Sequence, residues 1–593
     1  MCGIVGFLGD NPEKILIDRL KKLEYRGYDS AGVAVKSQNK VNIFKSKGEI
    51  KNLENIIKTT ENACLGIGHT RWATHGKPDE INAHPHLSSD GKWIVVHNGI
   101  IENYLTLKDK LVNDGYNFYS ETDTEIIAKF LEYYSKSGST LDAIKNTVNK
   151  LNGSFALCIL HKDDNHLFFV KNRSPLYVAK NADSVMVASD VVCFKGFSEE
   201  YYNIPDGYYG FADSNNVKFF DKLGEVQLST SELDLCEFES ETTFKHFMLK
   251  EIYETAPSIK NILEHYSLKN NRKQFDKIDF SKIKKFKFVG CGTAYHACLV
   301  GSDMLEEKTN VECNAYVASE FRYSNPKIGE DTLVVLVSQS GETADTLAAL
   351  ELARQKGAYT VAIVNVEYST LAKCADCYLP IKAGVEVGVA STKAYCAQLA
   401  VLYIFSQIIY EKMGLGSFNL DDLENLSKNF EYGNVTEFKL LADALKYNDR
   451  IFMIGRGVDY YSALEASLKI KETSYINSDT YYAGELKHGF LALIENDTYV
   501  IVFATDKKVL SKTISNAEEA RARGAKLILL TCFDFKPHEL DNFHYVIKVK
   551  NANGPLQSIL NIVPWQIIAY YTSIFKGINP DKPRNLAKSV TVE

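Results

Sequence analysis

The C-terminal two-thirds of the sequence contains an internal repeat, and this repeat limits the folds that the chain can adopt. Each copy has a glycine-rich strand end, then a short polar motif, then an apolar strand. The matched segments are 288–293 with 453–458, 318–322 with 483–487, and 333–337 with 499–503. A helix-like run and another apolar strand follow in both copies. Apolar β-branched runs that alternate with helices are typical of parallel α/β units, so the repeat predicts two tandem doubly wound parallel-sheet domains.

The two copies differ in the loop after the third matched segment. In the first copy this loop is rich in hydroxyls and runs into a helix, where N–H groups and the helix dipole favour a phosphate. Capping of the helix by the same hydroxyls is the alternative interpretation. The second copy has Ala504, Thr505 and Asp506 there, and a carboxylate would repel phosphate, so we expect only the first copy to bind it. In the first copy the loop runs from Ser338 through Gln339, Ser340, Gly341 and Glu342 to Thr343.

Neither copy carries a nucleotide motif. No GxxxxGK[ST] loop is present, and the segment 290–292 lacks the third glycine of a dinucleotide fingerprint because Tyr295 stands in its place. A sugar phosphate needs neither motif.

The second copy supplies acid–base groups instead. Glu465, Lys469 and Glu472 are spaced i, i+4 and i+7, which places them on one helical face. An exposed Glu–Lys ladder would have the same spacing. His488 follows in a Glu-Leu-Lys-His-Gly motif, and the chain ends in a tail that contains Lys588 among small and apolar residues.

The N-terminal third is marked by a cysteine at position 2. If Met1 is removed, Cys2 carries both a thiol and a free α-amino group. That amine has a reference pKa near 8, so it can act as the general base for its own thiol. Further along, an apolar strand ends in Asn98-Gly99, whose amide and N–H are suitable oxyanion donors; a hairpin turn is the alternative.

Several motifs of this third resemble class II glutamine amidotransferases, a family of N-terminal-nucleophile hydrolases with a four-layer αββα fold. They are CGIVG at 2–6, RGYDS at 26–30, HTRWATHG at 69–76, NG at 98–99 and TDTE at 122–125. The resemblance implies that Cys2 attacks the glutamine amide while Asn98 and Gly99 hold the oxyanion. It also implies that Arg71 and Asp123 bind the α-carboxylate and α-ammonium of glutamine. Thr74 and His75 would line the pocket, with Trp72 as a gate for ammonia.

Both repeats resemble sugar isomerase domains, and the whole chain resembles the family of isomerizing glutamine–fructose-6-phosphate aminotransferases. The ending RNLAKSVTVE is especially characteristic. The resemblance implies conversion of fructose 6-phosphate and L-glutamine to glucosamine 6-phosphate and L-glutamate, with ammonia channelled between the sites. In this scheme Ser338, Gln339, Ser340 and Thr343 grip the phosphate, and Thr293 and Ser391 help hold the sugar. His488 of a neighbouring subunit opens the ring, Lys588 forms a Schiff base, and Glu472 moves the proton with support from Glu465 and Lys469.

The sequence departs from that family at two positions. Ala294 and Phe490 stand where the family often has serine and proline, which puts the affinity for the sugar in question.

The resemblance and the repeat together predict the domain limits. We expect a glutaminase domain over 1–224, a linker over 225–246, sugar isomerase domains over 247–435 and 436–580, and an active-site tail over 581–593.

Composition and net charge limit the kinds of partner and cofactor that we expect the chain to bind. The net charge of -7 argues against broad electrostatic binding to nucleic acid or to anionic membranes. Twelve scattered cysteines are typical of reduced cytosolic thiols, so we expect a cytoplasmic protein. One CxxC at 374–377 lacks a second pair, which disfavours zinc, and we expect neither metal nor organic cofactor. We expect a homodimer.

Three alternatives remain open. The first is a class II amidotransferase with another acceptor, although the chain has no phosphoribosyltransferase motif and no SGGxDS loop. The second is a non-enzymatic sugar-phosphate sensor, which would not need Cys2 and Glu472 together. The third is a deglycase or phosphosugar isomerase, which usually lacks the N-terminal third.

Overall fold

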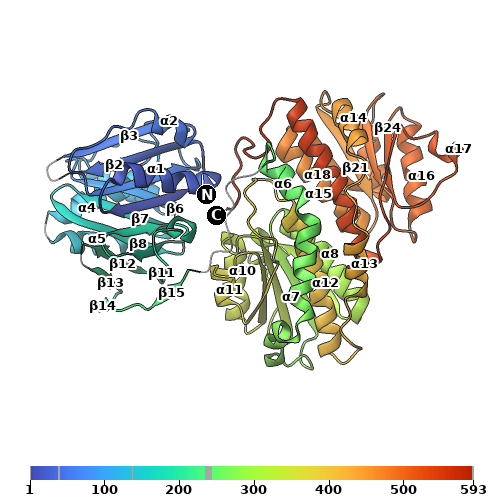
Figure 1. Cartoon of the computed structure of the whole chain (residues 1–593), viewed down its shortest axis with the longest axis horizontal. Coiled ribbons are helices and arrows are strands. Elements are labelled where there is room, and N and C mark those ends of the chain that lie inside the picture. Colours follow the sequence, from blue (N-terminus) through green and yellow to red (C-terminus); the bar gives the residue numbers. More distant parts are fainter. Residues whose placement is uncertain (1, 38–39, 137, 215, 234–242, 591–593) are drawn as a thin grey trace. The chain divides into compact units, whose positions relative to one another are not determined.

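The computed structural model of the chain describes residues 2–37, 40–136, 138–214, 216–233 and 243–590 (Figure 1). By internal contacts the chain divides into two compact units. Unit 1 comprises Met1–Phe238 and Ala587–Glu593, and unit 2 comprises Glu239–Leu586. No helix among the described residues is both long and apolar enough to cross a membrane.

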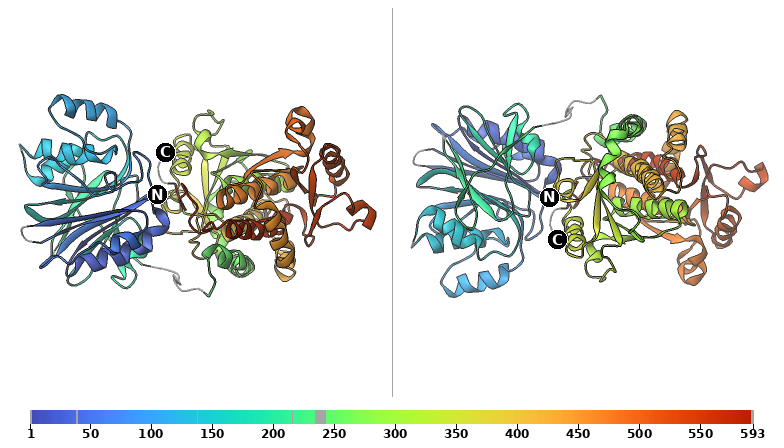
Figure 2. Two further views of the ribbon diagram at one scale, coloured as in Figure 1. Left: turned by 90° about the horizontal axis from the view of Figure 1, so that it is seen from above. Right: turned by 90° about the horizontal axis from the view of Figure 1, so that it is seen from below.

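Unit 1 consists of two stacked antiparallel sheets with helices outside them (Figure 2). The eight-stranded sheet has the order β15-β11-β9-β10-β1-β4-β2-β3, and the seven-stranded sheet has the order β14-β13-β12-β8-β7-β6-β5. Buried side chains from both sheets, such as Ile67 and Ile94, form one core between them. Helix α1 covers the outer face of the first sheet, and helices α3 to α5 cover the second. The predicted four-layer αββα fold is confirmed.

The strands of unit 1 are β1 (Gly3–Leu8), β2 (Ser30–Lys36), β3 (Val41–Lys47), β4 (Leu65–Arg71), β5 (His86–Leu87), β6 (Trp93–Ile101), β7 (Gly153–His161), β8 (Asp164–Asn172), β9 (Tyr177–Lys180), β10 (Val185–Ala188), β11 (Glu200–Asn203), β12 (Tyr208–Ala212), β13 (Val217–Phe220), β14 (Glu225–Val226) and β15 (Thr230–Glu232). Its helices are α1 (Pro12–Leu23), η1 (Glu24–Arg26), α2 (Ile50–Glu54), α3 (Tyr104–Asn113), α4 (Thr124–Ser135), α5 (Thr140–Val148) and η2 (Val191–Phe194).

Glycines in β4 let helix α1 approach the sheet closely. A Cβ atom on Gly66 or on Gly68 would lie 2.8 Å from a methyl carbon of Leu16 or Leu20. The Gly-Ile-Gly sequence of β4 therefore sets the depth at which α1 packs. This position matters for function because β4 continues into the loop beside Cys2.

The segment 225–246 was expected to be a linker, and its first part is not. Strand β14 pairs with β13, and β15 pairs with β11, so both short strands belong to the sheets of unit 1. Backbone pairing at a sheet edge tolerates the polar composition that suggested a linker. Residues 234–242 of the expected linker lie outside the described residues, and α6 begins at Phe247.

Unit 2 contains two five-stranded sheets whose strands are all parallel, and both have the same topology. The orders are β17-β16-β18-β19-β20 and β22-β21-β23-β24-β25. In each sheet the chain runs from the first strand to one neighbour and then returns to the other side of the first strand. The predicted tandem doubly wound domains are confirmed. Ligands in such sheets bind where the order reverses, outside the carboxyl ends of the strands.

The strands of unit 2 are β16 (Lys285–Gly290), β17 (Glu312–Val317), β18 (Thr332–Ser338), β19 (Tyr359–Val364), β20 (Cys377–Pro380), β21 (Arg450–Gly455), β22 (Asn477–Tyr482), β23 (Tyr499–Phe503), β24 (Lys526–Thr531) and β25 (Tyr545–Lys548). Its helices are α6 (Phe247–Tyr253), α7 (Thr255–Ser267), η3 (Lys269–Lys277), α8 (Thr293–Thr309), α9 (Ala318–Phe321), α10 (Ala344–Gln355), α11 (Thr370–Cys374), α12 (Lys393–Lys412), α13 (Asp421–Lys428), α14 (Val435–Leu445), α15 (Val458–Ser474), η4 (Ala483–His488), η5 (Phe490–Leu493), α16 (Leu510–Arg521), α17 (Pro537–Leu540), η6 (Gly554–Leu556) and α18 (Gln557–Phe575).

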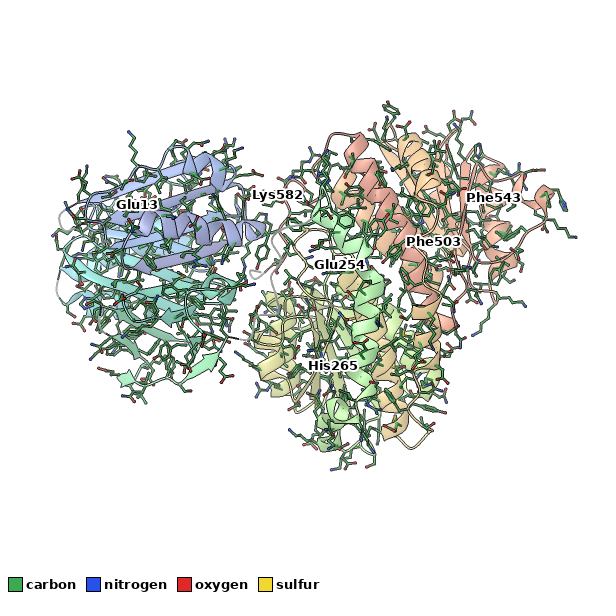
Figure 3. The ribbon with its side chains drawn as sticks, viewed as in Figure 1. Glu13, Glu254, His265, Phe503, Phe543 and Lys582 are labelled. Carbon is green, nitrogen blue, oxygen red and sulfur yellow. The ribbon has the colours of Figure 1, made fainter. Side chains whose placement is uncertain are left out.

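The two sheets of unit 2 share one large core. Helices α8 and α15 pack against each other, and so do α12 and α8, and α15 and α18. Buried side chains of these helices join those of both sheets in a single cluster, which includes Phe503 and Trp565 (Phe503 is labelled in Figure 3). Because α8 and α15 each begin at the carboxyl end of a first strand, their contact brings the ligand-binding ends of the two repeats together.

Candidate functional site

Cys2 lies at the start of β1, beside the end of β4 in the same sheet. The pairing of Gly3 with Thr70 puts Cys2 next to Trp72. The Trp72 amide donates to the Cys2 Sγ over 3.3 Å, an interaction that favours a thiolate. Burial raises the pKa of the Cys2 thiol above its ordinary value, and the Trp72 amide and the Arg71 guanidinium oppose this effect.

Asn98 and Gly99 come from the other sheet. They lie within β6, which continues to Ile101, and not at a strand end as the sequence suggested. Their pairing with Ala156 and Phe155 of β7 extends the strand and excludes the hairpin turn. The Asn98 Nδ2 donates to the Cys2 carbonyl oxygen over 2.9 Å, so the two sheets meet at this point.

Gly99 cannot be replaced by a residue with a side chain without moving the backbone. Its φ is 131°, and an added Cβ would lie 1.9 Å from the Ser154 carbonyl oxygen. Glycine is therefore required here by sterics, and it leaves the backbone beside Asn98 open to a ligand.

The residues predicted to bind glutamine surround one pocket. Its lining contains Cys2, Gly99 and all five of the predicted contacts, namely Arg71, Trp72, Thr74, His75 and Asp123. Asp123 Oδ2 accepts a hydrogen bond from the Ile101 amide over 2.8 Å, which fixes its carboxylate at the end of β6. The Arg71 guanidinium donates to carbonyl oxygens of the 75–77 loop, including Lys77 at 3.1 Å, and so orders the wall that carries Thr74 and His75.

Four buried histidines form a cluster at this pocket, and two of them, His84 and His97, line it. Sequence reasoning did not assemble this cluster. The rings of His69 and His84 are stacked with centroids 4.0 Å apart, and His86 and His97 adjoin them. His69 Nε2 lies 2.9 Å from the His97 carbonyl oxygen and 3.1 Å from Asn98 Oδ1. Both are acceptors, so this nitrogen carries the proton and orients the Asn98 amide, with its Nδ2 toward Cys2.

The histidine cluster predicts a loss of stability in weak acid. Burial lowers the pKa of His69 to about 3 and lowers the pKa values of the other three histidines as well. In the unfolded chain each histidine titrates near 6.5, so below that pH the unfolded state binds more protons than the folded one. Each histidine then removes up to about 1.4 kcal/mol of stability per pH unit as the pH falls.

Calorimetry between about pH 7.5 and about pH 5.5 checks this, because the range spans the unfolded histidine pKa. We expect the unfolding transition of unit 1 to move down by more than that of unit 2. Equal shifts of both transitions would contradict the account. The variant His265→Gln removes a partly exposed histidine of unit 2. As a control, it should leave the pH-dependent shift of the unit 1 transition unchanged.

In unit 2 the predicted phosphate loop follows β18, next to the point where the strand order reverses. Ser338 Oγ accepts a hydrogen bond from the Gly341 amide over 3.0 Å and lies 3.1 Å from Thr343 Oγ1. Thr343 occupies the N-cap position of α10, but its side chain makes no capping hydrogen bond. The alternative of simple helix capping therefore does not account for this hydroxyl.

Helix α15 places the predicted acid–base group beside the first repeat. Glu465 and Lys469 are fully buried, which excludes the exposed ladder. Lys469 Nζ lies 2.6 Å from Glu472 Oε2 and 3.3 Å from Glu465 Oε1, and it donates to Thr293 Oγ1 over 3.2 Å. Burial alone would lower the pKa of Lys469, but the two carboxylates raise it above its ordinary value, so the ammonium stays charged.

Two further residues contact predicted site residues or their neighbours and were not themselves predicted. His296 Nδ1 lies 2.8 Å from Glu465 Oε2, and its position one turn after Thr293 on α8 is the only sequence signal for it. Buried Glu386 accepts hydrogen bonds from the Ser391 hydroxyl over 3.1 Å and from the Thr392 amide over 2.9 Å. The loop with Ser391 is thus fixed at the start of α12, where Lys393 pairs with Glu254, labelled in Figure 3.

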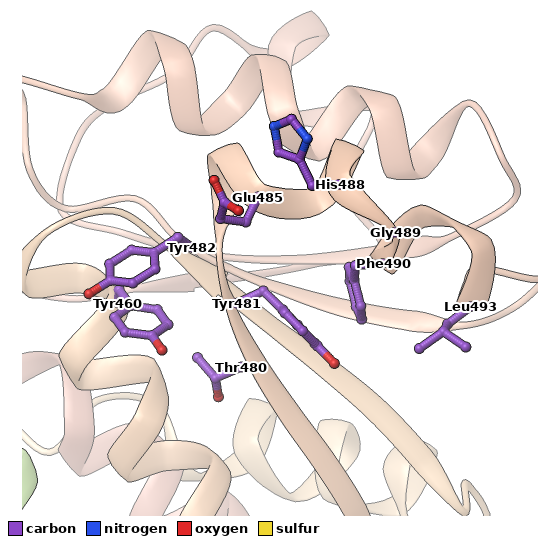
Figure 4. Close-up of a pocket in the computed structure, with 9 residues that line it drawn as sticks. All are labelled: Tyr460, Thr480, Tyr481, Tyr482, Glu485, His488, Gly489, Phe490 and Leu493. Carbon is purple, nitrogen blue, oxygen red and sulfur yellow. The ribbon is translucent and has the colours of Figure 1, made fainter.

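His488 lies in a different group. It is exposed at the end of η4 and lines a pocket with Glu485, Phe490 and the stacked rings of Tyr460 and Tyr482 (Figure 4). Phe490, one of the two departures, packs against Phe452 and Tyr481 in the core of the second repeat. By internal contacts, Lys588 groups with unit 1, whereas Thr293 groups with unit 2.

Comparison with known proteins agrees with this architecture. A family profile described as "Glutamine amidotransferase domain" matches residues 69–196, and one described as "SIS domain" matches residues 279–406 and 444–576. The chain is 42% identical to the glutamine–fructose-6-phosphate aminotransferase [isomerizing] of Clostridium tetani and 41% identical to that of Caldanaerobacter subterraneus, with 100% of both chains covered in each case.

A solved structure resembles unit 2. It is the C-terminal domain of glucosamine-fructose-6-phosphate aminotransferase from Francisella tularensis, 33% identical, with a TM-score of 0.51. The match covers 57% of this chain and 99% of that one.

Proposed function

We propose a residue-level mechanism on the premise that this chain belongs to the glutamine–fructose-6-phosphate aminotransferase (isomerizing) family. The chain converts fructose 6-phosphate and L-glutamine to glucosamine 6-phosphate and L-glutamate. The observation that carries the mechanism is that the chain holds two chemically distinct groups. One is a nucleophile pocket around Cys2, and the other is a buried carboxylate–ammonium group against Thr293.

In the first half-reaction the Cys2 thiolate attacks the side-chain carbonyl carbon of glutamine. Asn98 Nδ2 and the Gly99 N–H stabilise the oxyanion, ammonia leaves, and water then hydrolyses the thioester to glutamate. The α-amino group of Cys2, exposed by removal of Met1, accepts the thiol proton. Arg71 and Asp123 select the amino acid end of glutamine by opposite charge, and Thr74, His75 and Trp72 complete the pocket.

In the second half-reaction the phosphate of fructose 6-phosphate is held by Ser338, Gln339, Ser340 and Thr343. Thr293 and Ser391 hold the sugar, His488 of a neighbouring subunit opens the ring, and Lys588 forms a Schiff base with the open-chain ketose. Water is lost when this Schiff base forms. Ammonia then adds at C2 and displaces the Lys588 amine, which leaves the C2 imine of ammonia. Glu472 takes a proton from C1 and returns one to C2, which completes the change from ketose to aldose.

The buried pair beside Glu472 explains how its carboxylate can stay in place. Lys469 lies between Glu472 and Glu465, so the three groups carry one net negative charge instead of two. A fixed ammonium at 2.6 Å restrains the Glu472 side chain while leaving one carboxylate oxygen for the substrate. Glu465 and Lys469 are therefore assigned a positioning role.

The phosphate assignment predicts the effect of Ser338→Ala. The variant loses one hydroxyl that would face the phosphate, so we expect the KM for fructose 6-phosphate to rise about tenfold, as for one lost hydrogen bond to a charged group. Glutamine hydrolysis should change little. Ser281→Ala, in which the lost hydroxyl donates to the exposed Asp279, is the matched control. An unchanged KM in Ser338→Ala would remove this loop from the sugar site.

The same proposal includes a cytoplasmic homodimer. The exposed position of His488 on η4 supports a role toward a second copy, as does its separation from the Thr293 group. The geometry around Cys2 argues against a sugar-phosphate sensor and against a simple isomerase. Neither function requires a cysteine whose sulfur is hydrogen-bonded beside an oriented Asn98 amide.

A further inference from the structure

The two repeats of unit 2 match closely at the start of their first long helices. Helices α8 and α15 both have 17 residues, and each follows a glycine with a positive φ. The backbone angles are φ 52° and ψ -125° at Gly292, and φ 54° and ψ -130° at Gly457. Position 294 in the first repeat therefore corresponds to position 459 in the second. The first is Ala294, and the second is Asp459.

The Asp459 carboxylate is buried and accepts hydrogen bonds at both of its oxygens. Its Oδ2 accepts hydrogen bonds from the amides of Thr505 over 2.8 Å and Asp506 over 3.1 Å. Its Oδ1 accepts from the Thr505 hydroxyl and from Asn561 Nδ2. The residue is 1% exposed, so its carboxylate is shielded from water.

Strand register shows which residues of the first repeat match these donors. Val289 pairs with Leu336 in the first sheet, and the corresponding Ile454 pairs with Val502 in the second. Leu336 therefore corresponds to Val502. Three residues further on, Gln339 corresponds to Thr505, and four residues further on, Ser340 corresponds to Asp506. The amides that hold Asp459 are thus the counterparts of those in the proposed phosphate loop.

We propose that Asp459 is a built-in substitute for phosphate that closes the second repeat and confines the sugar phosphate to the first. This inference rests on the proposed function of the 338–343 loop. It replaces the earlier expectation that Asp506 repels phosphate, because the backbone amide of Asp506 binds an anion that the chain itself supplies. Ala294, which lacks a carboxylate, keeps the first repeat open.

The most direct test transfers the carboxylate to the first repeat. In Ala294→Asp the new side chain occupies the matched position and competes with the phosphate at close range. We expect the KM for fructose 6-phosphate to rise on the order of 100-fold or more, as for like charges a few ångströms apart. Ala294→Asn, of nearly the same size but neutral, should raise it far less, and Ala294→Ser should leave it close to the wild-type value.

Equal KM values for Ala294→Asp and Ala294→Asn would overturn the inference. Ser338→Ala separates this failure from failure of the proposed function. If Ser338→Ala raises the KM but Ala294→Asp does not, the phosphate loop stands and only the role of Asp459 falls. If neither variant changes the KM, the phosphate loop itself is wrongly assigned.

Variants of Asp459 in the second repeat provide an independent test of the proposal. Asp459→Ala leaves the amides of Thr505 and Asp506 without their acceptor and vacates the space of a carboxylate. We expect a lower Tm that inorganic phosphate restores, with a larger phosphate-dependent rise in Tm than in the wild type. Asp459→Asn keeps the space filled and should show only the wild-type rise. The same rise in all three proteins would contradict a closed anion site in the second repeat.

Discussion

The variant Cys2→Ala is expected to lose glutamine-dependent synthesis of glucosamine 6-phosphate. Removing a catalytic nucleophile costs at least about 10³-fold in kcat, because no other group can form the covalent intermediate. Cys2 belongs to unit 1, whereas the proposed acid–base group of the sugar site belongs to unit 2, so synthesis from added ammonia should persist. Both rates are measured by following glutamate and amino sugar with glutamine or with ammonium salt as the nitrogen donor.

Cys64→Ala is the matched control, because Cys64 is an exposed free cysteine in the same unit. It should behave as the wild type does with both donors. If Cys2→Ala also abolished ammonia-dependent synthesis while remaining folded, the two sites would not be separable as described.

The variant Glu472→Gln is expected to have the opposite phenotype. Loss of the proton-transferring carboxylate should lower the rate of amino sugar formation by about 10²–10⁴-fold with either nitrogen donor, the usual size of a general-base contribution. The isosteric amide keeps a partner for Lys469, so the change in stability should be small compared with the change in rate. Hydrolysis of glutamine at Cys2 should continue.

A carboxylate on an exposed helical pair provides the control for this variant. Glu264 on α7 lies 3.8 Å from Lys260, and both side chains are mostly exposed. Glu264→Gln should leave both half-reactions unchanged. A Glu472→Gln enzyme with a wild-type rate from ammonia would exclude Glu472 as the proton carrier.

Most of the fold and the pocket around Cys2 could be predicted from the sequence, because the sequence patterns that indicate them are local or repeated. The parallel sheets follow from apolar strands recurring at a fixed spacing, and the pocket around Cys2 follows from short motifs. The spacing of Glu465, Lys469 and Glu472 predicted a shared helical face, but it could not distinguish an exposed face from a buried one. That distinction depends on the packing of α15 against α8.

The features that could not be predicted depend on contacts between residues that are far apart in the sequence. His296 meets Glu465 across 169 positions, and Asp459 meets Thr505 across 46, so no local pattern indicates either pair. Asn98-Gly99 was placed at a strand end because the dipeptide favours turns, whereas pairing with β7 carries β6 past it. The strands β14 and β15 are too short and too polar for a periodic signal.

The central claim is that one chain releases ammonia at Cys2 and consumes it at the sugar site. The measurement that tests it most directly follows glutamate and glucosamine 6-phosphate together, using protein with an untagged N-terminus, with and without fructose 6-phosphate. We expect equal amounts of both products, formed only when the sugar is present. Glutamate formed without amino sugar, in the presence of fructose 6-phosphate, would contradict it and point to a different acceptor.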